Sequence, residues 1–229
     1  MFCTVQQTTV QQTTVSNLTN KQQGVETFAK KRKYSPNENG SNSPSVDRSM
    51  ITPPRILARR YPLTKTSHKY LDIGINVSTP SRVEIALGDN HGKELCLSYG
   101  VWKELVNQRG IIASFFKNDV DEAPPQTVGH CTLSFGKINN LKVMRLATSA
   151  LCLIMSSQTV CNMFALEYCV DCINHSLNNV TGMVDVKFAH FSEIVSGVKD
   201  PIAAIRDGKL FNKNDIIDCE LLAQIFRLR

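Results

Sequence analysis

The alternation of apolar and polar residues predicts two short antiparallel sheets in the middle of this chain. Residues 71–77 place Leu, Ile, Ile and Val on one face, and residues 82–87 alternate again before a glycine-rich turn at residues 88–92. Residues 130–135 and 141–146 repeat the pattern around a second turn. Because strand side chains point alternately to the two faces of a sheet, each sheet would bury one face and leave the other polar.

A helical pattern follows each predicted sheet. Residues 95–116 have the pattern of a strand entering an amphipathic helix, with Ser98 at the position of an N-cap. Residues 151–177 repeat this plan, and there Ser156 or Ser157 takes the capping position. The chain therefore predicts the α+β class, with two antiparallel sheet-plus-helix modules in tandem that form a pseudo-duplication.

Residues 1–60 differ from the rest of the chain in composition. The segment Val-Gln-Gln-Thr-Thr occurs at residues 5–9 and again at 10–14, and Ser, Asn and Pro follow with few large apolar side chains. Such a segment cannot bury enough apolar surface to offset the entropy lost on ordering. We predict a disordered, low-complexity, basic tail at residues 1–60, in which residues 55–62 serve as a basic linker to an α+β domain at residues 61–229.

The predicted domain divides where its periodicity breaks. An acidic stretch with two prolines, residues 119–125, separates the two modules. After the second module, residues 183–188 alternate like a strand, and residues 215–226 form an amphipathic terminal helix. The three parts are the first module, the second module and a C-terminal segment of one strand and helices, at residues 61–122, 123–180 and 181–229.

The excess positive charge is concentrated in the tail. Residues 1–60 hold nine Lys or Arg and three acids, which accounts for the net charge of +6, whereas the rest of the chain holds seventeen of each sign. A dense basic run beside Ser35-Pro36 has the form of a monopartite nuclear import signal, and phosphorylation there would offset part of its charge. The alternative is a solvated patch that contacts polyanions nonspecifically. The expectation is nuclear localisation through an import receptor that binds Lys30, Lys31, Arg32 and Lys33.

Candidate chemistry is sparse in this sequence. Cys169, Cys172 and His175 have the spacing of metal ligands, but zinc needs a fourth ligand and the sequence has no second Cys-x-x-Cys. The two cysteines also continue a helical apolar stripe, so we expect reduced core cysteines instead. Neither a nucleophile elbow nor a phosphate-binding glycine loop occurs. We expect a non-enzymatic protein with no metal and no cofactor.

Neither a secretory signal nor a membrane-spanning segment is indicated. Met1 leads into polar residues rather than into a charged start and an apolar core. Residues 147–166 are uncharged but contain too many Ser, Thr, Gln and Asn residues for a good spanning helix. A buried strand followed by a helix is expected there, in an intracellular protein without a membrane partner.

The strand Glu94-Leu-Cys-Leu97 leads directly into a helix that contains Trp102. This arrangement resembles the core of the positive cofactor 4-type transcriptional coactivators, in which a curved antiparallel sheet precedes one helix. The Whirly proteins resemble a fused pair of such units, as residues 65–178 do here. In a duplicated core, Trp102 and Phe164 would be buried on equivalent helices. The resemblance implies single-stranded DNA binding by a dimer, and its best matching positions are Leu95, Leu97, Trp102 and Leu105.

The sequence therefore favours a nuclear protein that binds single-stranded DNA or RNA in transcription or replication. The open faces of the two sheets would contact phosphate through positive side chains, although a solvated sheet face explains these residues equally well. The alternative hypothesis is an interaction scaffold or a module that forms a homo-oligomer, with no nucleic-acid contact by the folded core. The candidate nucleic-acid contacts are Lys65, Lys69 and Arg82 by the first sheet and Lys137, Lys142 and Arg145 by the second.

Overall fold

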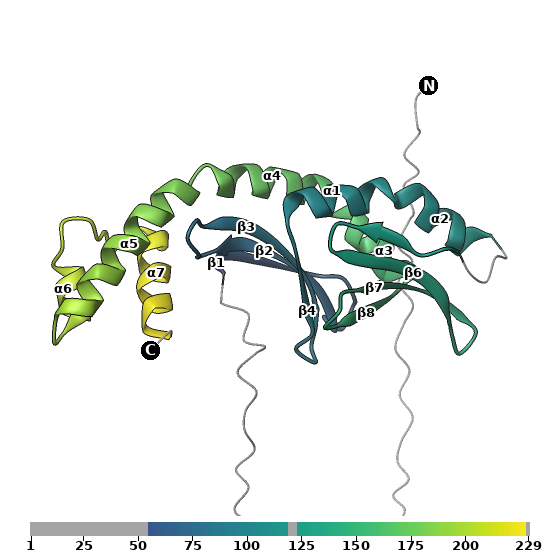
Figure 1. The fold of residues 1–229 in the computed structure, drawn as a ribbon, viewed down its shortest axis with the longest axis horizontal. Helices are drawn as coiled ribbons and strands as arrows, with labels where there is room; N and C mark the ends of the chain where they lie inside the picture. Colours follow the sequence, from purple (N-terminus) through teal and green to yellow (C-terminus); the bar gives the residue numbers. More distant parts are fainter. Residues whose placement is uncertain (1–54, 119–122, 228–229) are drawn as a thin grey trace, which may run out of the picture. The chain divides into compact units, whose positions relative to one another are not determined.

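The computed structural model describes residues 55–118 and 123–227 and has the α+β class that the sequence predicts (Figure 1). Two four-stranded antiparallel sheets are each followed by helices, and neighbouring strands in each sheet follow chain order. The predicted tail and the basic cluster Lys30–Lys33 lie outside the described residues. Sheet A consists of β1 (Ile56–Pro62), β2 (Lys69–Asn76), β3 (Arg82–Asp89) and β4 (Glu94–Leu97). Sheet B consists of β5 (Gln126–Val128), β6 (Cys131–Ile138), β7 (Leu141–Ala147) and β8 (Cys152–Ser156).

A pair of helices follows each sheet, and three further helices complete the described chain. The pair after sheet A is α1 (Tyr99–Asn107) and α2 (Arg109–Lys117). The pair after sheet B is α3 (Ser157–Ala165) and α4 (Glu167–Asn178). The C-terminal helices are α5 (Thr181–Gly197), α6 (Pro201–Arg206) and α7 (Ile216–Arg227). None of the helices in the described part of the chain combines the length and apolarity needed to cross a membrane.

The two helix pairs begin with the same cap. Ser98 accepts a hydrogen bond from the backbone N–H of Val101, and Ser156 accepts the corresponding bond from Thr159, as N-cap serines do. Four residues after each cap stand Trp102 and Val160, both buried. The predicted burial of Trp102 is confirmed, whereas the predicted burial of Phe164 is wrong. Origin of the two modules by duplication stays a prediction.

Phe164 is only partly buried because it lies off the stripe of α3 that faces sheet B. Val160 and Met163 occupy that stripe and are buried. The ring of Phe164 instead lies under the guanidinium of Arg109, with 4.9 Å from the arginine Cζ to the ring centre. Phe164 thus joins the two helix pairs rather than anchoring α3 on its own sheet.

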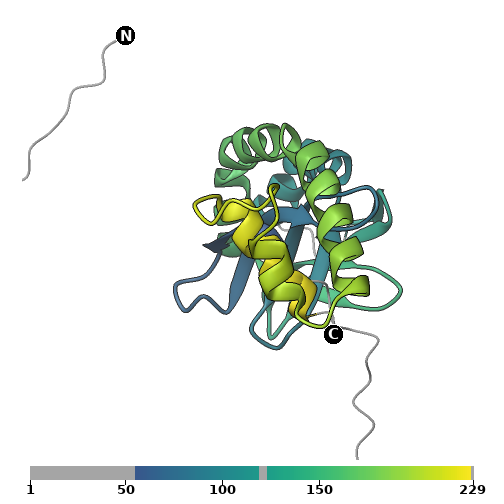
Figure 2. The same cartoon turned by 90° about the vertical axis from the view of Figure 1, so that its left-hand side faces the viewer.

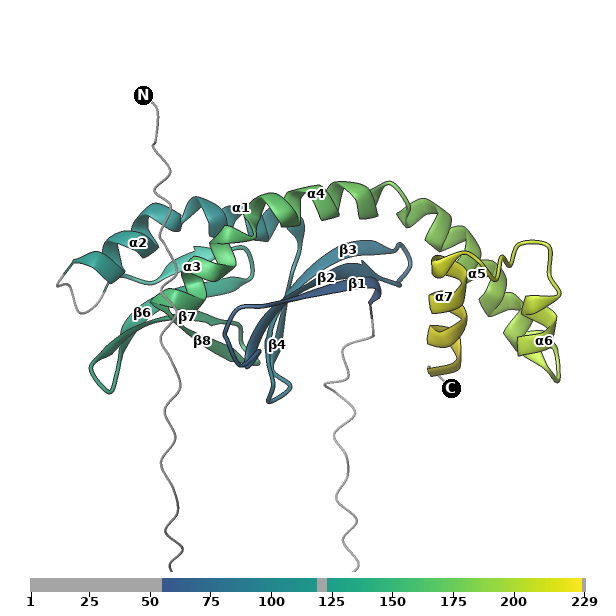
Figure 3. The ribbon, with the colours of Figure 1, turned by 180° about the vertical axis from the view of Figure 1, so that it is seen from behind.

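Each module contributes a helix that contacts the sheet of the other module. On sheet A, both α1 and α4 contact β3, and α4 also contacts β2, whereas α3 contacts β7 and β8 (Figure 3). Polar contacts tie α1 to α4: Tyr99 donates to Asp171 at 3.1 Å, and the ammonium of Lys103 lies 3.1 Å from the same carboxylate. Exposed polar contacts of this kind are weak because water screens them, so apolar burial supplies most of the stability between the modules.

Two predicted boundaries are wrong. Residues 56–62 form the edge strand β1 rather than a linker, so the folded region starts before residue 61. Residues 183–188 belong to helix α5 rather than to a strand, because Val184 and Phe191, two helical turns apart, are buried while Val186 is 64 % exposed.

The C-terminal helices pack on one another and reach sheet A. Figure 2 shows α5 and α7 side by side, and Lys187 of α5 contacts Asp218 of α7 at 2.6 Å. On the other side of α7, the Glu220 carboxylate accepts a hydrogen bond from the backbone N–H of Leu57 in β1. The predicted terminal helix is therefore confirmed, and it supports the strand that the sequence pattern did not predict.

Candidate nucleic-acid interface

The polar face of sheet A is buried rather than open. Strand alternation places the apolar residues of β2 to β4 under the helices and the polar ones on the opposite face. On that opposite face Asp72 is 4 % exposed and Glu84 7 % exposed, so the predicted open, phosphate-binding surface is wrong for this sheet. The side chains gathered there come from three strands and are Tyr70, Asp72, Asn76, Glu84, Glu94 and Cys96.

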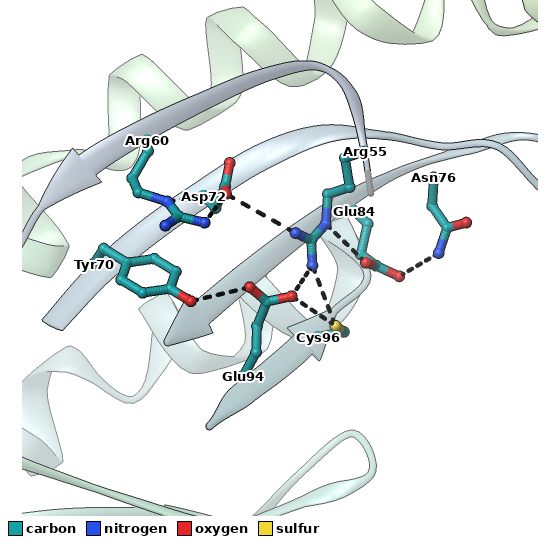
Figure 4. A network of polar contacts seen from close by, with 8 residues as sticks. All are labelled: Arg55, Arg60, Tyr70, Asp72, Asn76, Glu84, Glu94 and Cys96. Carbon is teal, nitrogen blue, oxygen red and sulfur yellow. Dashed lines mark hydrogen bonds and ion pairs between the residues drawn. The ribbon is translucent and has the colours of Figure 1, made fainter. Parts of the chain in front are cut away.

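Arg55 lies at the centre of this buried face (Figure 4). Its Nε donates to Glu84 at 2.9 Å, and its Nη2 donates to Glu94 at 2.5 Å and to the sulfur of Cys96 at 3.4 Å. Asp72 lies 4.0 Å from the Nη1 atom. Buried carboxylates are tolerated only when they are paired. Arg55 therefore pairs with Glu84 and Glu94 on this sheet face, and Asp72 lies at the limit of an ion-pair distance from it.

Electrostatics within this network favour a charged arginine and a neutral thiol. Burial works against the charge of Arg55, but its hydrogen bond to Glu94 and the charges of Glu94 and Glu84 outweigh it and raise the pKa of Arg55. Burial, followed by the charge of Glu84, raises the pKa of Cys96 to about 11. Because only the thiolate is a strong nucleophile, Cys96 is unreactive at neutral pH. The network is suited to holding structure rather than to covalent chemistry.

A second arginine lies at the solvent side of the network. The guanidinium of Arg60 donates to one oxygen of Asp72, at 2.8 Å from Nη2 and 3.2 Å from Nε, and lies over the ring of Tyr70 at 3.8 Å. Tyr70 in turn donates to Glu94 at 3.2 Å. The side chain of Arg60 remains 56 % exposed. Arg60 thus links the buried acids to the surface.

Two loops meet beside Arg60 at one end of sheet A. The backbone N–H of Asn90 donates to the carbonyl of His68 at 2.9 Å, and the rings of His68 and His91 are 5.2 Å apart. A hollow of about 590 Å³ opens there between Arg60, Tyr70 and the β3–β4 turn. Residues 59–70 and 89–93, which build this end, contain five Lys or Arg and one acid, Asp89. We call it the cationic end of sheet A.

Asp89 closes the turn at this end and leaves the cations in excess. Its carboxylate accepts hydrogen bonds from the backbone N–H groups of His91 and Lys93. Burial opposes its charge, but these bonds and the nearby Lys69 outweigh it and lower the pKa of Asp89. Asp89 is buried, and the backbone N–H groups of the turn together with Lys69 balance its negative charge. The exposed charges of this end are therefore positive.

The predicted contacts by sheet A are only partly brought together. Lys65 is exposed in the loop between β1 and β2, and Lys69 begins β2 at the same end, 3.8 Å from Asp89. Arg82 pairs with Asn76 at the opposite end of the β2–β3 hairpin, so it does not share a surface with the other two. All three residues lie by the first sheet as predicted, but they do not form one surface.

The predicted contacts by sheet B are divided between its two faces. Lys137 pairs with Lys142, on the face that also carries the buried Met144 and Leu146. The ammonium of Lys142 donates to the carbonyl of Phe115 at 2.9 Å and so caps the end of α2. Arg145 lies on the opposite face, beside Gly136. All three cations lie on the β6–β7 hairpin by the second sheet as predicted, but they do not share one open face of it.

The cysteine motif in α4 shows no ligand geometry. Cys169 is half-buried and its thiol lies 3.4 Å from the hydroxyl of Tyr61, whereas Cys172 and His175 are exposed. The prediction of a core cysteine is wrong for Cys172. Among the residues that the structure describes, no group of three or more His, Cys, Asp or Glu side chains is placed to hold a metal ion.

Three important residues of this end were not predicted, namely Arg60, Tyr70 and Lys93. Arg60 was assigned to a linker, because β1 has no alternation of its own. One signal could have found it: Asp72 and Glu84 stand at mid-strand positions, and buried acids require a cation close by. The arginines that most closely precede the first predicted strand are Arg55, Arg59 and Arg60.

Comparison with protein-family models, with curated proteins and with solved structures finds no match to this chain. The resemblance to Whirly and positive cofactor 4-type proteins therefore stays a prediction. A functional proposal therefore rests on the residues and contacts of this chain alone.

Proposed function

We propose that the folded domain binds single-stranded DNA or RNA through the cationic end of sheet A, as a non-enzymatic nuclear protein that acts in transcription or replication without a cofactor. One observation carries this proposal: residues 59–70 and 89–93 bring five Lys or Arg to one end of a sheet, and their one acid, Asp89, is buried beside Lys69. Phosphate neutralisation by such side chains supplies most of the affinity of nonspecific nucleic-acid binding.

Residues 61–229 hold equal numbers of positive and negative side chains, but this balance is compatible with a phosphate-binding site. The acids nearest to the cationic end are directed inward, with Asp72 paired to Arg60 and Glu94 paired to Arg55. Lys65 and Lys93 are exposed on the two loops that meet there. A phosphate chain that approaches these loops therefore meets cations first, which favours association with a polyanion.

Reversing two exposed charges at this end should weaken binding. In the full chain, Lys65→Glu combined with Lys93→Glu is expected to lower the affinity for a single-stranded oligonucleotide. The slope of log affinity against log salt should shrink by roughly 0.7 for each phosphate that the protein no longer neutralises. Fluorescence anisotropy at several salt concentrations measures both quantities.

Lys209→Glu combined with Lys213→Glu is the matched control, because it makes the same charge change at exposed positions near α6 and α7. We expect this control to bind nearly as the unchanged protein does. Equal weakening by the two double variants would contradict the site. Binding that survives the reversal at Lys65 and Lys93 but disappears on deletion of residues 1–54 would assign the activity to the tail.

Nuclear import is proposed to depend on the basic cluster at Lys30, Lys31, Arg32 and Lys33. Changing all four residues to Ala in a fusion with a fluorescent protein should abolish nuclear enrichment, because import receptors recognise dense positive charge in an accessible segment. Microscopy of living cells measures the ratio of nuclear to cytoplasmic fluorescence. An unchanged ratio would remove the basis for the nuclear assignment.

A second candidate function is protein interaction, including self-association. The observation that favours it is the outer face of sheet B, where Ile138, Leu141 and Ile154 are 39 %, 71 % and 37 % exposed. Exposed apolar side chains on one sheet face are typical of protein contact surfaces. In addition, a groove of about 920 Å³ lies between α6 and α7 and includes Phe211 and Phe226. Failure of the folded core to bind nucleic acid would favour this scaffold function.

A further inference from the structure

The guanidinium of Arg60 lies over the ring of Tyr70, which in turn lies over Gly88. A Cβ atom on Gly88 would lie 2.3 Å from the Tyr70 ring, so only glycine leaves room for that ring to lie across β3. The guanidinium of Arg60 covers the ring at 3.8 Å, and Asp72 holds the guanidinium through two of its nitrogens. The order from the sheet outward is therefore Gly88, Tyr70 and Arg60.

The layer outside Arg60 is open. More than half of the Arg60 side chain is exposed, and it borders the hollow of about 590 Å³ that Ser67 and Asn90 also line. Asp72 neutralises the charge of Arg60, so Arg60 attracts phosphate less strongly than an unpaired arginine would. The guanidinium of Arg60 still provides a planar, weakly hydrated surface for contact, and its contacts with Tyr70 and Asp72 hold it in position.

We propose that the exposed plane of Arg60 stacks an unpaired nucleobase, with Tyr70 and Asp72 as positioning residues. Proteins that recognise single strands stack splayed bases on aromatic rings or on guanidinium planes. A base in a duplex is already stacked on both sides, so this platform selects single strands. The inference rests on the proposed function and adds to it a contact with the base, which the exposed lysines do not make.

The test compares two probes with the same number of phosphates. One is a single strand of about twelve nucleotides, and the other is the same strand with abasic sites throughout. The full chain is expected to bind the strand with bases more tightly, by about 5- to 150-fold for each base stacked. Arg60→Lys keeps the charge and removes the plane, so it should abolish this preference while leaving affinity for the abasic strand nearly unchanged.

Arg59→Lys is the matched control, because Arg59 is exposed and is the neighbour of Arg60 on the same strand. This control should keep the preference for the strand with bases. Tyr70→Phe retains the supporting ring and should also keep it, whereas Tyr70→Leu should lose it. Thermal melting of each variant confirms that the binding is measured on folded protein.

The outcomes separate the two proposals. Equal affinity of the unchanged protein for both probes would overturn the stacking platform and leave phosphate binding in place. Equal weakening of both probes by Arg60→Lys would also overturn it, since Arg60 would then be a phosphate contact. Binding of neither probe would overturn the platform together with the proposed function.

Discussion

Replacement of Arg55 by Met should lower the free energy of unfolding by about 3–5 kcal/mol, as loss of one partner from a buried ion pair usually does. The side chain of Arg55 is 5 % exposed and contacts Glu84 and Glu94 at 2.9 and 2.5 Å. Without it, these two acids and Asp72 would share a buried sheet face with no cation at its centre. Urea unfolding followed by circular dichroism measures the decrease in stability.

Arg82→Met is the matched control, because Arg82 is an exposed arginine at the start of β3. Its expected effect lies within about 0.5 kcal/mol, as for most surface substitutions. Adding Glu84→Gln to Arg55→Met should recover part of the stability, since residues in one network do not contribute additively. An unchanged unfolding midpoint for Arg55→Met would show that the buried network does not stabilise the sheet.

Replacement of Trp102 by Ala should cost about 3–5 kcal/mol, the usual effect of truncating a large buried aromatic side chain. Trp102 is fully buried, and its Nε1 makes no hydrogen bond, so the cost comes from removed apolar packing and from the cavity left behind. Denaturant unfolding measures it. The comparison is Phe164→Ala, which should cost clearly less because Phe164 is only partly buried.

Equal costs for Trp102→Ala and Phe164→Ala would contradict the packing described for α1 and α3. They would instead support the full burial of Phe164 that the sequence pattern suggested. Trp102→Phe is a useful third variant, because it retains an aromatic ring at the site. Its cost should fall between zero and that of the alanine variant.

The local sequence pattern predicted the strands and helices that depend on residues close together in the chain. Alternation at residues 71–77 and 141–146 predicted β2 and β7, and the serines at positions 98 and 156 predicted where the helices begin. These features depend on periodicity and on capping within a few residues. The class of the fold, with two sheets each followed by helices, follows from them.

Local pattern failed where an element depends on distant partners. Residues 56–62 carry no alternation, since β1 is an edge strand that is held by pairing with β2 and by Glu220 from α7. Residues 183–188 alternate over a short window, but packing of Val184 and Phe191 selected the helix. Tertiary packing overrides propensity in such segments.

The candidate site shows the same division. Lys65 and Lys69 precede the first alternating strand in a segment without acids, which can be read directly from the chain. The folded structure shows in addition that Arg60 lies on Tyr70, that Lys93 joins them from another loop, and that Arg82, Lys142 and Arg145 lie elsewhere. The physical reason is that strand register and loop contacts join residues far apart in the chain, whereas periodicity reports only which face each residue occupies.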